Sequence, residues 1–245
     1  MKIGIISDIH ANLEALEAAL SVYDRLPVDY LACLGDVVGY GAQPDECCDL
    51  VRKYADVTVL GNHDAAVCGR MDYSYYRAAA REALDWHARQ LSEENMAWLC
   101  ALPYNAHMES HGINFCHGSP LALEEFEYIF VLDQMRDVVA AFEEQTPVTF
   151  IGHSHLCKSF SYDAETAEEV LNTRFSLDPS RKYIITVGSV GQPRDYDTRA
   201  CCAIYDTDER RFEYHRVNYD IEGAARKIFE AELSVAFGKR LFLGV

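Results

Sequence analysis

The sequence predicts an α/β fold in which two mixed β-sheets pack face to face between helices, a four-layer α/β/β/α sandwich. Strand-like and helix-like segments alternate over the first sixty residues in the order β-α-β-α-β, which indicates parallel strands joined by helical crossovers. After residue 148 the chain becomes rich in strand-like segments, which favours a second sheet packed on the first. A chain of 245 residues is long enough to bury a large core in one domain.

The first part of the chain supplies three strands and two helices. Lys2–Ser7 is a short apolar run with β-branched residues, which is typical of a buried strand. The apolar positions between Leu13 and Leu20 recur at helical spacing. Further strands are expected at Tyr30–Leu34 and Val57–Leu60, and a helix at Pro44–Tyr54, whose proline suits a first helical turn.

The segment of about residues 71–103 interrupts this alternation. Residues 74–101 contain no Gly or Pro and are expected to be helical, so we predict a helical insertion within a single domain that spans residues 1–245. A hairpin with the strands His107–Ser110 and Ile113–Cys116 is expected to follow. The other expected elements are a helix at Val131–Phe142, strands at Val148–Ile151, Tyr183–Val187, Cys201–Asp206 and Phe212–Val217, and a last helix at Ile221–Phe237.

Five short polar blocks each follow an apolar run that is typical of a strand. They supply Asp, Asn and His side chains, whose oxygen and nitrogen atoms bind hard or borderline divalent metals. Loops at strand ends of an open α/β sheet meet in a shared crevice, so we expect a metal site at the carboxyl ends of the strands. The blocks are Asp8-Ile9-His10, Gly35-Asp36, Gly61-Asn62-His63-Asp64, Cys116-His117-Gly118 and Gly152-His153-Ser154-His155.

In order and spacing, these blocks resemble the calcineurin-like metallophosphoesterases, whose pattern is D-x-H, G-D, G-N-H-[DE], H and G-H-x-H. The match spans residues 8 to 155. The resemblance implies an α/β/β/α sandwich and a hydrolase of phosphoesters that uses two divalent metal ions. It assigns to the first metal Asp8, His10, Asp36 and His155. It assigns to the second metal Asp36, Asn62, His117 and His153.

The identity of the metals and of the proton donor also follows from this resemblance. Manganese and iron are the ions we expect, and nickel and zinc stay compatible because a mixed oxygen and nitrogen donor set selects weakly among divalent metals. The resemblance makes His63 the group that contacts the phosphate and protonates the leaving oxygen, and imidazole, with an unperturbed pKa of ~6.5, suits this work. Asp64 has two open roles: it orients His63 as part of the catalytic machinery, or it caps a short helix that begins there.

The substrate prediction depends on two loops. The serine/threonine protein phosphatases carry Asp-Arg-Gly after the second block, where this chain has Gly39-Tyr40-Gly41, and this form resembles small bacterial phosphodiesterases, including the diadenosine-polyphosphate-hydrolase-related branch. Tyr40 either stacks on a base or packs under its loop. Arg194 lies in a glycine-rich loop, where it either binds a phosphate or pairs with Asp195 or Asp197.

We therefore expect a phosphodiesterase or pyrophosphatase that acts on a small nucleotide-like substrate by attack of a metal-bound hydroxide, with Asn62, Tyr40 and Arg194 at the substrate. One alternative is a phosphomonoesterase or a serine/threonine phosphoprotein phosphatase. The other alternative is a catalytically weak, metal-binding regulatory protein. Such a protein would be expected to have lost a metal ligand or His63, and this sequence retains all of them.

Composition restricts the partners and the compartment. A net charge of −17 repels polyanions, so we expect a small phosphorylated substrate and no general nucleic-acid binding. Nine cysteines without C-x-x-C indicate reduced, mostly buried thiols. Without a signal peptide or an apolar run of ~20 residues, we expect a cytoplasmic protein with no membrane contact, in an oligomeric state that the sequence does not specify. Surface or packing roles are expected for the histidines outside the blocks, which are His87, His107, His111 and His215.

Overall fold

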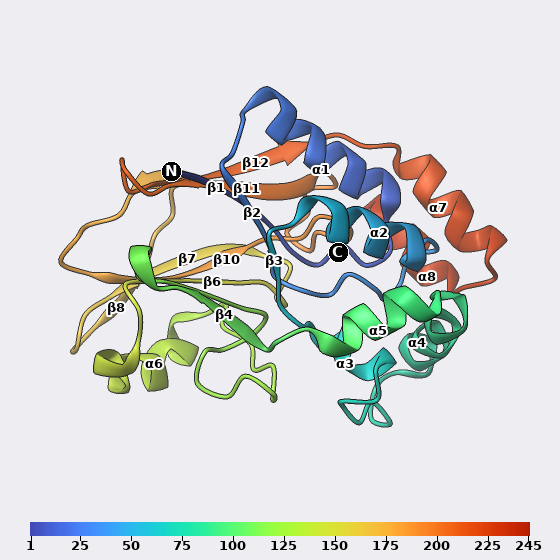
Figure 1. Cartoon of the computed structure of the whole chain (residues 1–245), viewed down its shortest axis with the longest axis horizontal. Coiled ribbons are helices and arrows are strands. Elements are labelled where there is room, and N and C mark those ends of the chain that lie inside the picture. Colours follow the sequence, from blue (N-terminus) through green and yellow to red (C-terminus); the bar gives the residue numbers. More distant parts are fainter.

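The computed structural model describes residues 1–245 and contains two six-stranded sheets packed face to face, with helices on both outer faces (Figure 1). This arrangement confirms the predicted four-layer α/β/β/α sandwich. The strands are β1 Lys2–Ile6, β2 Tyr30–Cys33, β3 Val57–Thr58, β4 Asn105–Met108, β5 Ile113–Cys116, β6 Val148–Ile151, β7 Cys157–Tyr162, β8 Ala167–Glu169, β9 Arg174–Ser176, β10 Lys182–Val187, β11 Ala200–Asp206 and β12 Arg211–Val217. The helices are α1 Leu13–Arg25, α2 Pro44–Tyr54, α3 Asn62–Val67, α4 Ala78–Gln90, α5 Glu93–Ala101, α6 Arg136–Ala140, α7 Ile221–Glu230 and α8 Val235–Leu241.

Each sheet joins a parallel trio of strands to antiparallel neighbours, so both sheets are mixed as predicted. The first sheet has the order β3-β2-β1-β11-β12-β9, in which β1, β2 and β3 are parallel. The second sheet has the order β4-β5-β6-β10-β7-β8, in which β5, β6 and β10 are parallel. The other pairings are antiparallel. The two parallel trios matter for function because polar loops follow their carboxyl ends.

An aromatic core fills the space between the sheets. Phe150 of β6 is fully buried and stacks on Phe115 of β5, with ring centroids 5.9 Å apart. On its other side, Phe150 stacks on Phe212 of β12 in the opposite sheet, at 5.8 Å. Separate apolar clusters cover the outer faces, where α1, α2 and α5 pack on the first sheet and α6 packs on the second. In Figure 1, α1 and α6 accordingly lie on opposite outer faces of the sandwich.

Two of the predicted long helices are broken in the structure. The helix expected over residues 74–101 is divided into α4 and α5, because Ser92 begins a new helix by accepting a hydrogen bond from the Asn95 N–H. The helix expected at Ile221–Phe237 is divided into α7 and α8, and Glu232 between them has a φ of 57°, which lies outside the right-handed helical region.

Other predicted elements differ in extent. The helix expected at Val131–Phe142 is reduced to α6, with a short 3-10 helix on each side. The sequence analysis missed β7, β8 and β9. The last two are short and largely polar. Neither of these two strands shows the alternating apolar pattern by which a strand is recognised in a sequence. None of the helices combines the length and the apolar character that crossing a bilayer demands.

Candidate active site

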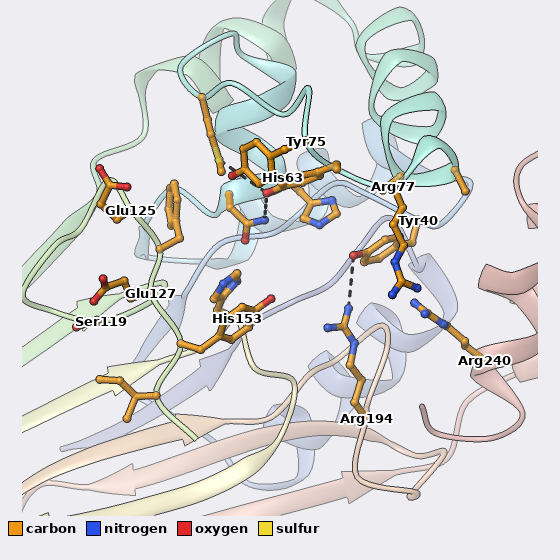
Figure 2. A pocket seen from close by; sticks show the side chains of 18 of the residues that line it. Tyr40, His63, Tyr75, Arg77, Ser119, Glu125, Glu127, His153, Arg194 and Arg240 are labelled. Carbon is orange, nitrogen blue, oxygen red and sulfur yellow. Dashed lines mark hydrogen bonds between the residues drawn. The ribbon is translucent and has the colours of Figure 1, made fainter. Parts of the chain in front are cut away.

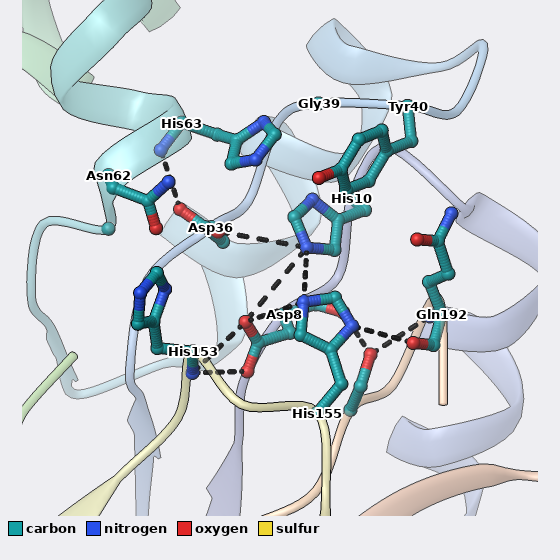
Figure 3. A network of polar contacts seen from close by, with 12 residues as sticks. Asp8, His10, Asp36, Gly39, Tyr40, Asn62, His63, His153, His155 and Gln192 are labelled. Atoms are coloured by element: carbon teal, nitrogen blue, oxygen red, sulfur yellow. Dashed lines mark hydrogen bonds and ion pairs between the residues drawn. The ribbon is translucent and has the colours of Figure 1, made fainter. Parts of the chain in front are cut away.

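The seven predicted metal ligands lie together at one side of the sandwich, each after the carboxyl end of a parallel strand, and Figure 3 labels all of them except His117. Asp8 and His10 follow β1, and Asp36 follows β2. All seven side chains are buried. The site contains three overlapping groups of donor atoms, and within each group the atoms lie within 4.8 Å of one another. These groups are Asp8-His10-His155, His10-Asp36-His63 and Asp36-His117-His153. Asn62 joins them from the first position of α3, where its Oδ1 lies 3.1 Å from His117 Nε2.

Left-handed backbone at the strand ends directs these side chains toward one another. The φ angles are 53° at Asp8, 51° at His10, 51° at Asp36, 66° at His153 and 59° at His155. A non-glycine residue in this region costs roughly 1–2 kcal/mol. Such conformations persist where the surroundings hold them, and they cluster at functional sites. Here the loops hold one another, since the His10 N–H donates to the Asp36 carbonyl at 2.9 Å.

Backbone carbonyls fix the protonation of three ligand histidines. The Nδ1 atoms of His10, His117 and His155 lie 3.0, 2.6 and 2.6 Å from the carbonyl oxygens of Val38, Leu34 and Gln192. A carbonyl oxygen only accepts hydrogen bonds, so each Nδ1 carries the proton. In the neutral ring, each Nε2 then presents a lone pair, which is the form that binds a metal.

These lone pairs face other acceptors. His10 Nε2 lies 3.1 Å from His155 Nε2, and His155 Nε2 lies 3.4 Å from Asp8 Oδ1. His117 differs, because its protonated Nε2 donates to Asn62 Oδ1 at 3.1 Å, and the Asn62 amide donates to the Tyr76 hydroxyl at 2.7 Å. Acceptors at such distances repel one another unless a cation lies among them. The donor set therefore fits divalent metal ions.

The charge states agree with this interpretation. Burial holds the pKa of His10, His153 and His155 well below its usual range, so these rings are neutral. Burial also acts to lower the pKa of His117, but the carboxylates of Asp36 and Asp8 outweigh it and raise that pKa to about 9. The metal-free chain thus holds an ion pair between Asp36 and His117, and metal binding must displace the proton.

His63, a member of one donor group but not a predicted metal ligand, lines the pocket. Its ring contacts the His10 ring at 4.9 Å and the Tyr40 ring at 4.6 Å between centroids. Burial lowers the pKa of His63 to about 4, and its Nδ1 atom has no hydrogen-bond partner. The Asp64 carboxylate instead accepts from the N–H groups of Gly61 and Val38, both at 3.1 Å. Of the two roles left open for Asp64, these contacts favour the one in which it caps α3.

Three further residues support the site from outside the polar blocks. His87 of α4 is fully buried; its Nδ1 accepts from the Gly39 N–H and its Nε2 donates to the Gly41 carbonyl, both at 2.8 Å. It thereby clamps the loop that carries Tyr40. Tyr128 stacks on the ring of His153 at 3.8 Å, and Tyr76 holds Asn62. The sequence analysis expected only a surface or packing role for His87, since this residue lies outside the polar blocks.

A pocket of about 1080 Å³ opens beside the ligand groups (Figure 2). Its lining includes the predicted substrate residues Asn62, Tyr40 and Arg194. Arg194 Nη2 lies 3.5 Å from the Tyr40 hydroxyl and 3.3 Å from Gln192 Oε1. The alternative in which Arg194 pairs with an acid of its own loop is wrong, because Asp195 pairs with Arg216 and Asp197 pairs with Arg199.

The fold and the convergent donor atoms define a metal-dependent phosphoesterase. The family model of the calcineurin-like phosphoesterase superfamily domain matches residues 1–210. The chain belongs to this superfamily, as the order of its polar blocks predicted.

Relatives of similar length are known. An uncharacterised protein of Methanocaldococcus jannaschii is 37% identical over 244 residues, which cover 99% of this chain and 98% of that protein. The crystal structure of a metallophosphoesterase from Sphaerobacter thermophilus is 37% identical with a TM-score of 0.84, covering 100% of this chain and 99% of the other. The structure of a hypothetical protein from Pyrococcus horikoshii shares the fold, with a TM-score of 0.80 and 18% identity, covering 100% of this chain and 98% of the other.

Gly39 lies close to the imidazole rings of His63 and His10, so a substitution at Gly39 tests how tightly these rings are packed. Gly39 has a φ of 101°, and a Cβ there would lie 2.3 Å from His63 Nδ1 and 3.0 Å from His10 Nδ1. We expect Gly39→Ala to lower hydrolysis of a chromogenic aryl phosphodiester by ~10²-fold, the loss that a displacement of about 1 Å can cause. The matched control is Gly69→Ala, where φ is 68° but a Cβ meets nothing within 4 Å. Equal rates for the two variants would contradict this packing argument.

Proposed function

We propose that this chain hydrolyses a phosphodiester or pyrophosphate bond of a small nucleotide-like molecule, with two divalent ions held in the buried centre. The observation that carries the proposal is the position of Asp36. Its Oδ2 atom lies 3.6 Å from His10 Nε2 and 3.4 Å from His117 Nε2, so one carboxylate faces both groups of ligands. A shared carboxylate of this kind is typical of two-metal sites. Manganese or iron is our preferred pair, with nickel and zinc as the alternatives.

When bound, two such ions lower the pKa of a coordinated water towards ~7 and neutralise charge on a phosphate. The side chains of this protein supply the rest. Asp36 Oδ1 accepts the His63 N–H at 2.8 Å, which fixes the start of α3 and therefore the positions of Asn62 and His63. The His63 imidazole lines the pocket and is our proposed donor of a proton to the leaving oxygen, with the anionic phosphate stabilising its charged form.

Three features support a small substrate with a planar group. The pocket volume of about 1080 Å³ is at the upper end of that of small-molecule sites. Its wall carries Tyr75 and Tyr128, which are 68% and 43% exposed and thus available for stacking on a base. Arg194 has no carboxylate partner and is our proposed phosphate ligand. A phosphomonoesterase or phosphoprotein phosphatase is the alternative activity, and a catalytically weak metal-binding regulator is the alternative class.

We also propose a cytoplasmic location and a small phosphorylated partner. All nine cysteines are free thiols, which suits a reducing compartment. The net charge of −17 disfavours binding to nucleic acids.

The metal stoichiometry is tested by substitution of the shared carboxylate. Asp36→Asn should lose at least one of two divalent ions per monomer, because the amide removes both the bridging geometry and a negative charge. Metal analysis after dialysis measures this loss, with the exposed Asp24→Asn as the control that keeps both ions. Two bound ions and unchanged activity in Asp36→Asn would refute the assignment.

The role of His63 is tested with two leaving groups. His63→Ala should keep both metals but lose ~10²–10⁴-fold in kcat on substrates with a poor leaving group, the range of general acid catalysis. A nitrophenolate leaves without a proton, so the loss of kcat should be smaller on a substrate with this leaving group. The exposed His111→Ala serves as the control. An equal loss on both substrates would mean that His63 binds phosphate and does not donate a proton.

The substrate class is tested by comparing kcat/KM for a dinucleoside polyphosphate, an aryl phosphodiester and a phosphoserine peptide. We expect kcat/KM to be higher for the two non-peptide substrates than for the peptide, because the loop at Tyr40 lacks the Asp-Arg-Gly of the phosphoprotein phosphatases. A tenfold preference for the peptide would replace this proposal with the phosphatase alternative. No turnover of any substrate by the metal-loaded protein would favour the regulatory alternative.

A further inference from the structure

Three arginine side chains gather at one end of the pocket. Arg77 directly precedes α4, Arg194 follows β10, and Arg240 lies in α8. Figure 2 shows their guanidinium groups close to Tyr40, on the same side of His153. None of the three takes part in an ion pair, although the chain carries 39 acidic residues and a net charge of −17. In so acidic a protein, unpaired arginines at one place require an explanation.

The arginines repel one another without an anion between them. Burial and then the positive charges of Arg194 and Arg77 lower the pKa of Arg240. The Nε atom of Arg194 is buried without a hydrogen-bond partner. The acids nearest in sequence are already engaged, because Asp195 and Asp197 pair with other arginines. A bound anion would relieve the repulsion and accept the unused donors.

Tyr40 contacts both the arginine cluster and the ligand groups. Its ring contacts the rings of His10 and His63 at 4.6 Å each, and Arg194 Cζ lies 5.9 Å from the same ring centroid. Tyr40 also packs on Phe237 of α8 at 4.9 Å. The backbone of Arg194 also lies next to His155, whose carbonyl accepts its N–H at 3.3 Å. An anion held by the three arginines therefore lies beside Tyr40, adjacent to a phosphate held at the metal ligands.

The opposite end of the pocket has the opposite charge. Glu125 and Glu127 line it, and the three arginines are the only arginine or lysine residues in the lining of the pocket. Figure 2 shows Glu125 and Glu127 on the far side of His153 from the arginines. Carboxylates repel a phosphate and accept hydrogen bonds from hydroxyl or amino groups. The pocket thus distinguishes an anionic end of a ligand from an uncharged one.

We propose that Arg77, Arg194 and Arg240 bind a second phosphate of the substrate, one that is not cleaved, so that the substrate class is a small molecule with a polyphosphate chain and an uncharged polar end. The inference rests on the proposed function and deepens it by adding Arg77 and Arg240 as specificity-determining residues. Guanidinium forks bind phosphate bidentately, and three of them from three separate elements fix its position. The uncharged end then lies against Tyr128, between Glu125 and Glu127.

A binding experiment on the metal-free protein tests the arginine cluster without catalysis. Inorganic tripolyphosphate is titrated by calorimetry into the parent and into Arg77→Ala/Arg240→Ala. We expect the double variant to bind at least tenfold more weakly, because only one of the three guanidinium groups, that of Arg194, remains. The matched controls are Arg89→Ala in α4 and Lys239→Ala in α8, which remove exposed positive charges outside the pocket and should bind as the parent does. Binding that is absent in the parent, or equal in the double variant and the controls, would overturn the proposal.

A kinetic experiment separates this proposal from the proposed hydrolase activity. With metal-loaded protein, KM for a dinucleoside polyphosphate should rise at least tenfold more in Arg77→Ala/Arg240→Ala than KM for an aryl phosphodiester that lacks a second phosphate. Arg77→Lys/Arg240→Lys should recover part of the loss, since lysine keeps the charge but not the fork. An unchanged ratio of the two KM values would overturn the arginine assignment and leave the hydrolase in place. A parent without turnover would instead refute the hydrolase, and the calorimetry would still decide the arginine cluster.

Discussion

Hydrogen-bond acceptors face one another in the buried centre of this phosphoesterase, and the rest of the structure has to hold them there. His10 Nε2 points at His155 Nε2 at 3.1 Å, and His155 Nε2 lies 3.4 Å from Asp8 Oδ1. Such contacts are unfavourable in a buried site that lacks a cation. Five of the seven ligand positions also carry left-handed backbone, which adds strain. The fold therefore holds electrostatic repulsion and backbone strain at the place where divalent ions would offset them.

Both sheets share the task of holding this centre together. His117 follows β5 of the second sheet, but its Nδ1 donates to the Leu34 carbonyl at the end of β2 in the first. The Asp8 carboxylate follows β1 and accepts the N–H of His153, which follows β6, at 3.0 Å. A Cβ on Gly152 would lie 2.0 Å from Ser7 Oγ, so only glycine allows these two strand ends to approach so closely. The centre is complete only when the sheets pack correctly, and assembly of the sandwich is therefore also assembly of the site.

Features that depend on local sequence could be predicted, and features that depend on distant contacts could not. The polar blocks follow apolar strands, so the convergence of Asp8, Asp36 and His153 followed from topology alone. His87 gave no such signal, because its partners Gly39 and Gly41 are far away in the chain and a buried helical histidine most often only packs. The break beside Ser92 gave only a weak cap signal in the sequence, and the break beside Glu232 was missed because no Gly or Pro, the residues that usually end a helix, lies at that point.

The helices α4 and α8, which flank the pocket, hold Tyr40 in place beside the catalytic centre that the two sheets form. The metal ligands and His63 all lie within residues 1–210, the part matched by the family model, whereas Phe237 and Arg240 belong to α8 beyond it. His87 of α4 holds the Tyr40 loop, and Phe237 of α8 packs on the Tyr40 ring. Tyr40 thus joins the catalytic centre to a helical layer that the metal site does not require. A change in α4 or α8 can alter the surroundings of Tyr40 while the candidate metal ligands stay in place, so on the proposed function bond cleavage and substrate choice depend on different parts of the fold.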